Sequence, residues 1–305
     1  MDLYLPIAEI SVNFVVIVLL GVGVGFLSGM FGVGGGFLTT PLLILYGIPP
    51  AVAVASAASQ VTGSSVSAAL SYWRQNRIDL KMGGVLIAGG VAGAGAGSWL
   101  FAVLTQAGQI DVAIGLIYVA LLGAVGMLML REGLRDLAAV RAGASPPTRM
   151  RGHNPLIAAL PWRTRFYRSG LYISPLGPLA LGFAVGVLTM LIGVGGGFLM
   201  VPAMLYLLGM AATVVVGTSL FHIVFTTAAA TMLHAVGSQT VDVVLAALLL
   251  VGGVVGAQLG VRTAATLPPE RTRLLLAAIV LAVAIRLGVG LTWQPAELYT
   301  VFAGA

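Results

Sequence analysis

The sequence predicts an all-α polytopic membrane protein made of two inverted-topology repeats, each with about five segments and a helix broken at a glycine-rich motif. Three observations lead to this fold class. Charged residues make up only 8% of the 305 residues, against about 25% in soluble domains. Several stretches without any charge are long enough to cross a bilayer. The motif Gly-Val-Gly-Gly-Gly-Phe-Leu occurs twice.

The composition excludes several other classes of protein. With 59% apolar residues and so few charges, a soluble fold could not cover its surface, and disordered or collagen-like chains are excluded too. The net charge of +6 is not spread over one face, which argues against a nucleic-acid binder. The chain has no cysteine, and its apolar segments hold no pairing of serine with a base and no carboxylate pair. We therefore expect no enzyme, no metal site and no cofactor.

We expect the first apolar segment to be retained rather than cleaved as a secretory signal peptide. Residues 1–13 contain Asp2 and Glu9 but no basic residue, unlike a secretory signal. The stretch Val12–Trp73 then runs for 62 residues without a charge, enough for two or three crossings. Its middle, Gly32–Gly36, holds four glycines, each about 1 kcal/mol poorer than alanine in a helix. We therefore expect a break there.

The first repeat spans residues 12–130, and residues 173–292 repeat its pattern. The motif at Gly193–Leu199 matches Gly32–Leu38 at an offset of 161 residues. Further along, Ile78-Asp79 matches Val241-Asp242 at an offset of 163. Each half also carries a stripe of glycines spaced by four, for which we expect close helix packing within or between the repeats. The stripes are Gly89, Gly93 and Gly97, and Gly252, Gly256 and Gly260.

Residues 131–172 between the repeats read as a basic linker. They contain eight arginines and four prolines, and the positive-inside rule places them in the cytoplasm. Binding of nucleic acid or phosphoinositide by these arginines is the weaker alternative. The basic loops Arg74–Lys81 and Arg262–Arg273 share that side only if each half has five segments. The repeats are then inverted, in an inner membrane, with both termini periplasmic.

The two glycine-rich breaks are the first candidates for a binding site. A broken helix exposes backbone N–H groups and the positive end of its dipole, which favours an anion. The helices predicted at Phe37–Tyr46 and Phe198–Leu207 begin at such ends, and Thr39 adds a hydroxyl near the first. The alternative is that the glycines only permit tight helix crossing. The candidate glycines are Gly34, Gly35, Gly36, Gly195, Gly196 and Gly197.

The helix after each break is unusually polar. Ser56 and Gln60 in the first half correspond to Thr218 and His222 in the second, at an offset of 162. An uncharged histidine at mid-bilayer can donate to an anion or shuttle a proton, although hydroxyls also serve plain helix packing. Arg286 lies roughly 8 Å inside the last apolar segment. There it either snorkels to the interface or supplies a counter-charge to the substrate.

The doubled motif with its following prolines, together with the basic central loop, resembles the TauE/SafE family. These are inner-membrane permeases described as exporters of sulfite and small organosulfonates. The resemblance covers residues 12–292 and implies secondary transport of a small sulfur-containing oxyanion, sulfite or an organosulfonate such as sulfoacetate. We expect alternating access in a monomer or homodimer, with the anion and the lipid bilayer as partners and no nucleic acid. An anion channel of the same fold and a non-transporting membrane assembly protein are the alternatives.

Overall fold

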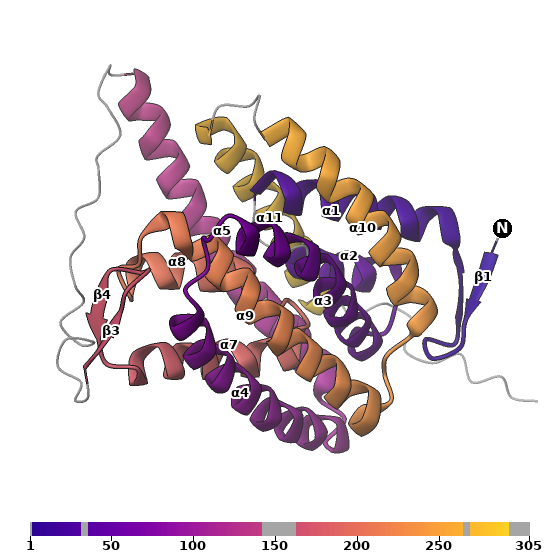
Figure 1. Cartoon of the computed structure of the whole chain (residues 1–305). Helices are drawn as coiled ribbons and strands as arrows, with labels where there is room; N and C mark the ends of the chain where they lie inside the picture. The colour runs from indigo at the N-terminus through magenta and orange to yellow at the C-terminus, as the bar shows by residue number, and fades with distance from the viewer. Residues whose placement is uncertain (1, 32–35, 142–162, 265–268, 293–305) are drawn as a thin grey trace, which may run out of the picture.

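The structure, a computed structural model, describes residues 2–31, 36–141, 163–264 and 269–292 (Figure 1). Its first half consists of β1 (Asp2–Leu5), β2 (Ile10–Asn13), α1 (Phe14–Phe31), α2 (Gly36–Tyr46), α3 (Pro50–Arg74), α4 (Leu80–Gln106) and α5 (Ile110–Arg141). Its second half consists of β3 (Thr164–Phe166), β4 (Leu171–Ile173), α7 (Leu176–Ile192), α8 (Gly197–Tyr206), α9 (Ala212–Leu233), the π-helical turn η1 (His234–Ser238), α10 (Val243–Ala264) and α11 (Pro269–Thr292).

The fold is helical because a helix satisfies its backbone hydrogen bonds internally, as a lipid environment requires. Within the described residues, five helical segments are long and apolar enough to cross a membrane. They are Leu80–Gln106, Ile110–Arg135, Val214–Ser238, Val243–Gly260 and Leu274–Thr292. Shorter apolar helices cover Phe14–Ser28, Gly36–Tyr46 and Leu176–Ile192. The predicted all-α polytopic membrane protein is confirmed.

The two halves pack into each other rather than side by side. Helix α1 lies along α10, and α4 lies along α7, which is the same pairing with the halves exchanged (Figure 1). The next largest contacts join equivalent helices, α5 with α11 and α3 with α9, and α9 and α3 also contact α4 and α10 of the opposite half. The duplication read from the sequence is therefore matched by an exchange of partners between halves. The inverted sense of the two repeats stays a prediction.

The glycine stripes form the contacts between halves, as predicted. A Cβ built on Gly93 would lie 2.1 Å from the carbonyl oxygen of Phe183 on α7. A Cβ on Gly256 would lie 2.0 Å from the carbonyl oxygen of Val22 on α1. Only hydrogen fits in such gaps, so these glycines let the helix backbones touch. Their role is packing.

Each half begins with a short antiparallel hairpin that the sequence analysis did not predict. Strand β1 pairs with β2, and β3 pairs with β4. Both turns end in a residue with positive φ, Glu9 at 54° and Gly170 at 64°. The hairpins therefore belong to the duplicated unit. The second one begins within residues 131–172 and ends at Ile173. The end of α5 at Arg141 also lies within residues 131–172, while residues 142–162 lie outside the described residues.

Candidate functional site

The break between α7 and α8 is a run of glycines in left-handed conformations. Gly193 ends α7 with φ 68° and donates its N–H to the Thr189 carbonyl oxygen. Gly195 and Gly196 follow with φ 67° and 70°, and α8 begins at Gly197. Residues with a side chain rarely adopt this backbone conformation, so the sequence needs glycine at all three positions. The second short helix, predicted at Phe198–Leu207, is confirmed at Gly197–Tyr206.

The break is buried against α3, with no room for side chains. A Cβ on Gly193 would lie 2.3 Å from the Val54 carbonyl oxygen, and one on Gly195 would lie 2.7 Å from Cγ1 of Val61. A Cβ on Gly196 would lie 2.1 Å from a methyl group of Val185 on α7. Irregular backbone at membrane depth is tolerated when protein surrounds it in this way.

The start of α2, which follows the first break, lies against the second break. Gly36, the first residue of α2, lies where a Cβ would be 2.9 Å from the Val194 carbonyl oxygen of the second break. The rings of Phe37 and Phe198, the second residues of α2 and α8, have centroids 5.5 Å apart. The other predicted glycines of the first break, Gly34 and Gly35, lie outside the described residues. The helix predicted at Phe37–Tyr46 is confirmed at Gly36–Tyr46.

The carbonyl group that the break frees at the end of α7 is satisfied by the first half. The hydroxyl of Thr40 donates to the Ile192 carbonyl oxygen at 3.4 Å, and the hydroxyl of Tyr118 donates to the same oxygen. Because both donors come from α2 and α5, the end of α7 is held by the opposite repeat. The positive ends of α2 and α8, in contrast, are helix N-termini whose first N–H groups have no partner within the helix.

Gln60 and His222 occupy equivalent buried positions on α3 and α9, with exposed fractions of 2% and 0%. Gln60 accepts a hydrogen bond from the Thr39 hydroxyl at 2.9 Å. Gln60 also faces Gly253 on α10, where a Cβ would lie 2.7 Å from its amide nitrogen. His222 faces Gly90 on α4 in the same way, at 2.6 Å from Nε2. Each polar side chain thus sits against a glycine of the opposite half.

The ring of His222 has one nitrogen engaged and one left over. Nε2 lies 3.0 Å from the Thr226 hydroxyl, one turn further along α9. Nδ1 is buried and has no hydrogen-bond partner among the described residues. A buried polar atom without a partner costs about 1–3 kcal/mol, so proteins seldom keep one without a reason. Nδ1 can hydrogen-bond a bound ligand.

The polar residues connect to both breaks through their neighbours in the chain. Val61, next to Gln60, would be touched by a Cβ on either Gly36 or Gly195. Ile223, next to His222, lies 3.1 Å from a Cβ on Gly195. The structure therefore packs α3 against the start of α2 and the second break through Val61, and α9 against the second break through Ile223. A single binding site formed by the starts of α2 and α8, Gln60 and His222 stays a prediction.

Ser56 and Thr218 lie one turn before Gln60 and His222 and bind backbone of the opposite half. The Ser56 hydroxyl accepts from the Asp242 N–H at 3.2 Å, and the Thr218 hydroxyl accepts from the Asp79 N–H at 3.0 Å. Both hydroxyl-bearing residues are fully buried. They hold the starts of α10 and α4 against α3 and α9, so in this structure the two hydroxyls fix helices in place.

The two aspartates complete this arrangement, which the sequence analysis missed. One carboxylate oxygen of Asp79 accepts from the Met82 N–H and caps α4, while the other accepts from the Ser169 N–H at 2.9 Å and its hydroxyl at 2.6 Å. Asp242 likewise caps α10 and accepts from the Ile7 N–H at 3.2 Å. Each aspartate joins a helix start to the hairpin of the other half. Their matching repeat positions before long apolar helices were the available signal.

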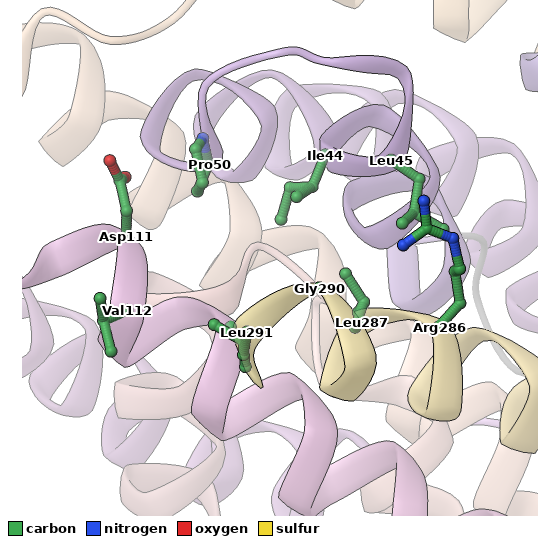
Figure 2. Close-up of a pocket in the computed structure, with 10 residues that line it drawn as sticks. Ile44, Leu45, Pro50, Asp111, Val112, Arg286, Leu287, Gly290 and Leu291 are labelled. Carbon is green, nitrogen blue, oxygen red and sulfur yellow. The ribbon is translucent and has the colours of Figure 1, made fainter. Parts of the chain in front are cut away.

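Arg286 and His234 lie apart from these contacts. Arg286 is exposed on α11 and lines a separate pocket with residues of α2, α3 and α5, none of them predicted site residues (Figure 2). His234 has both ring nitrogens within hydrogen-bond distance of protein groups, the Met190 carbonyl oxygen at 3.0 Å and the Ser238 hydroxyl at 3.2 Å. His234 therefore has a structural explanation, whereas His222 does not.

Comparison with known proteins gives one family and several relatives. A family model described as sulfite exporter TauE/SafE matches residues 17–287. The chain is 30% identical over 274 residues to YjnA of Bacillus subtilis (strain 168), named a probable membrane transporter protein, covering 89% of this chain and 98% of that one. A second probable membrane transporter protein of that organism, YunE, is 27% identical over 256 residues, covering 81% and 87%. One from Xylella fastidiosa (strain 9a5c) is 28% identical over 275 residues, covering 88% and 93%. No solved structure matches the chain.

Proposed function

Because the chain belongs to the TauE/SafE family of sulfite exporters, we propose that it is a secondary transporter that exports a small sulfur-containing oxyanion. The substrate is sulfite or an organosulfonate such as sulfoacetate. Transport proceeds by alternating access of the two halves around a site at the glycine breaks. The observation that carries the proposal is the unpartnered Nδ1 of His222, a buried residue whose chain neighbour Ile223 lies against Gly195 in the break before α8. Helix N-termini such as the start of α8 favour an anion.

The chemistry of the proposed site suits such a ligand. A sulfonate has three acceptor oxygens that share one negative charge, and charge-assisted hydrogen bonds from backbone N–H groups satisfy it without an ion pair. The N–H groups at the starts of α2 and α8 and the Nδ1–H tautomer of His222 are the donors. The amide of Gln60 is the equivalent donor from α3. The carboxylates of Asp79 and Asp242 are already engaged in hydrogen bonds to helix starts and hairpins, so they take no part in binding the anion.

The exchange of partners between halves supports a mechanism in which the halves rock against each other. Helices α3 and α9 pack together and carry Gln60 and His222, so relative movement of the halves shifts both sides of the site at once. Ser56 and Thr218 tie these helices to the starts of α10 and α4 of the opposite half. Movement at the site is thereby linked to movement at the two ends of the molecule.

We also propose that the protein lies in the inner membrane with its central loop in the cytoplasm. Contacts of the β3–β4 hairpin support this orientation. The β3–β4 hairpin, at the end of the linker, meets the start of α4: Arg168 donates to the Ile78 carbonyl oxygen, and Lys81 donates to the Arg165 carbonyl oxygen. Basic residues from two separate loops thus gather at one end, as the positive-inside rule requires for the cytoplasmic side. The termini would then be periplasmic.

The proposal is tested by efflux from proteoliposomes loaded with sulfite, sulfoacetate, sulfate or chloride. We expect saturable efflux of sulfite or a sulfonate, and accumulation against a gradient once the coupling ion is imposed. Flux that only follows the electrochemical gradient would show the anion channel instead. A protein that moves none of these anions above empty liposomes would be neither, and the assembly alternative would stand.

A further inference from the structure

The pocket that contains Arg286 lies apart from the proposed transport site. Its volume is about 380 Å³, and it opens between the end of α2, the start of α3, the start of α5 and the last turns of α11 (Figure 2). Apolar side chains make up most of its wall, among them Ile44, Leu45, Leu287 and Leu291. The two charged residues in the wall are Asp111 and Arg286.

These two charges are complementary but separated. Figure 2 shows the Asp111 carboxylate at one end of the pocket and the Arg286 guanidinium at the other, on opposite sides of the apolar wall. Neither side chain makes a hydrogen bond or an ion pair with another described residue. Asp111 comes from the first turn of α5 and Arg286 from α11, the equivalent helix of the other half. An acid and a base held apart in one pocket match a ligand that carries both charges.

We propose that this pocket binds a zwitterion with an ammonium group and an anionic oxyanion at its two ends. The planar guanidinium of Arg286 is suited to a phosphate or sulfonate, and the Asp111 carboxylate accepts from the ammonium. The apolar wall receives the carbon link between them. A phosphatidylethanolamine headgroup and a free molecule such as phosphoethanolamine share this chemistry, and both can reach a pocket on the surface of the helix bundle.

The position of the pocket suits a ligand drawn from one membrane surface. The chain enters α5 at Ile110 and leaves α11 at Thr292, so both charged residues lie near the same end of the bundle. The loop between α2 and α3 lies at that end as well, since Leu45 and Pro50 line the pocket. In the proposed orientation this is the periplasmic end. The ligand would bind there without entering the transport site.

The test measures binding rather than transport, so it is independent of the proposed function. Delipidated protein is titrated with phosphatidylethanolamine, phosphatidylglycerol and soluble phosphoethanolamine, and adducts are counted by native mass spectrometry. We expect phosphatidylethanolamine, phosphoethanolamine or both to bind, through the headgroup that they share, and phosphatidylglycerol to bind more weakly. Retention of the lipid alone identifies a lipid site, and retention of the soluble molecule identifies a site for free solutes.

Variants assign the binding to the two residues. Arg286→Gln should weaken binding of either zwitterion about tenfold or more, because a hydrogen bond to a charged group is lost. Asp111→Asn should remove the preference for the ammonium, so that phosphatidylglycerol binds as well as phosphatidylethanolamine. Arg262→Gln, at an exposed arginine outside the pocket, is the matched control and should change nothing. Equal binding by wild type and both pocket variants, or no binding of any zwitterion, overturns the proposal.

Discussion

Replacing Gly90 with alanine should disturb His222 without touching any other part of the proposed site. A Cβ at this position would lie 2.4 Å from the Thr226 hydroxyl oxygen and 2.6 Å from Nε2 of His222, whereas ordinary contacts begin at 3.4 Å. Both side chains must therefore move. Overpacking costs about 1–3 kcal/mol, and alanine returns about 1 kcal/mol of helix propensity. We expect a net loss of about 0–2 kcal/mol in stability.

The transport rate should fall much more than the stability. If Nδ1 of His222 donates to the substrate, a displaced ring loses a charge-assisted hydrogen bond, which corresponds to about tenfold or more in efflux at low substrate concentration. The matched control is Gly95→Ala on the same helix, where a Cβ meets nothing within 4 Å. Thermal unfolding in detergent and initial efflux rates from proteoliposomes are measured for both variants. The reasoning is refuted if Gly90→Ala and Gly95→Ala transport equally well.

Three further changes probe other contacts. Gly93→Ala puts a Cβ 2.1 Å from the backbone oxygen of Phe183, so it should cost about 3 kcal/mol or more; a melting temperature equal to wild type would contradict this. Asp242→Asn weakens the hydrogen bond that this side chain accepts from the Ile7 N–H, so the stability of the protein should fall by about 1–2 kcal/mol in thermal unfolding. Protease should also cleave the first hairpin faster, and an unchanged cleavage rate would contradict the role of Asp242 in holding that hairpin. His222→Gln, which installs the residue of the equivalent position in the first half, should keep the fold and slow efflux; unchanged efflux kinetics would remove the histidine from the mechanism.

The fold class and the repeat could be predicted from the sequence because bilayers impose strong composition rules. Charge-free stretches located the helices, and the run of glycines located the breaks to within one residue of the observed starts of α2 and α8. The contact role of the glycine stripes followed from their spacing. Each of these signals is local, so no knowledge of packing was needed.

The hairpins could not be predicted in the same way. Strands of four and three residues, β1 and β3, carry too short a pattern, and Ile10–Asn13 merges with the apolar start of α1. Their stability depends on distant partners such as Asp242, whose contact with Ile7 spans 235 positions. Nothing in the local sequence encodes such a contact.

The candidate site was predictable only in part. Repeat alignment paired Gln60 with His222, and the structure places both at equivalent buried positions. The same alignment paired Ser56 with Thr218, yet these hydroxyls bind the backbone of the two aspartates. Helical spacing puts residues on one face but does not say which neighbour that face meets. The same limit applies to Arg286: the sequence gives its depth in the apolar segment but not the side of the helix on which its side chain lies.

The most direct measurement is thermal stability of the purified protein in detergent with sulfite, sulfoacetate, sulfate or chloride, for wild type and His222→Gln. A ligand that binds only the folded state, at about 100 times its dissociation constant, adds about 2.7 kcal/mol. We predict that sulfite or a sulfonate stabilises the wild type by this order, that sulfate and chloride do not, and that the variant loses the effect. Equal responses to all four anions, or equal responses of the two proteins, would contradict an anion site at the glycine breaks.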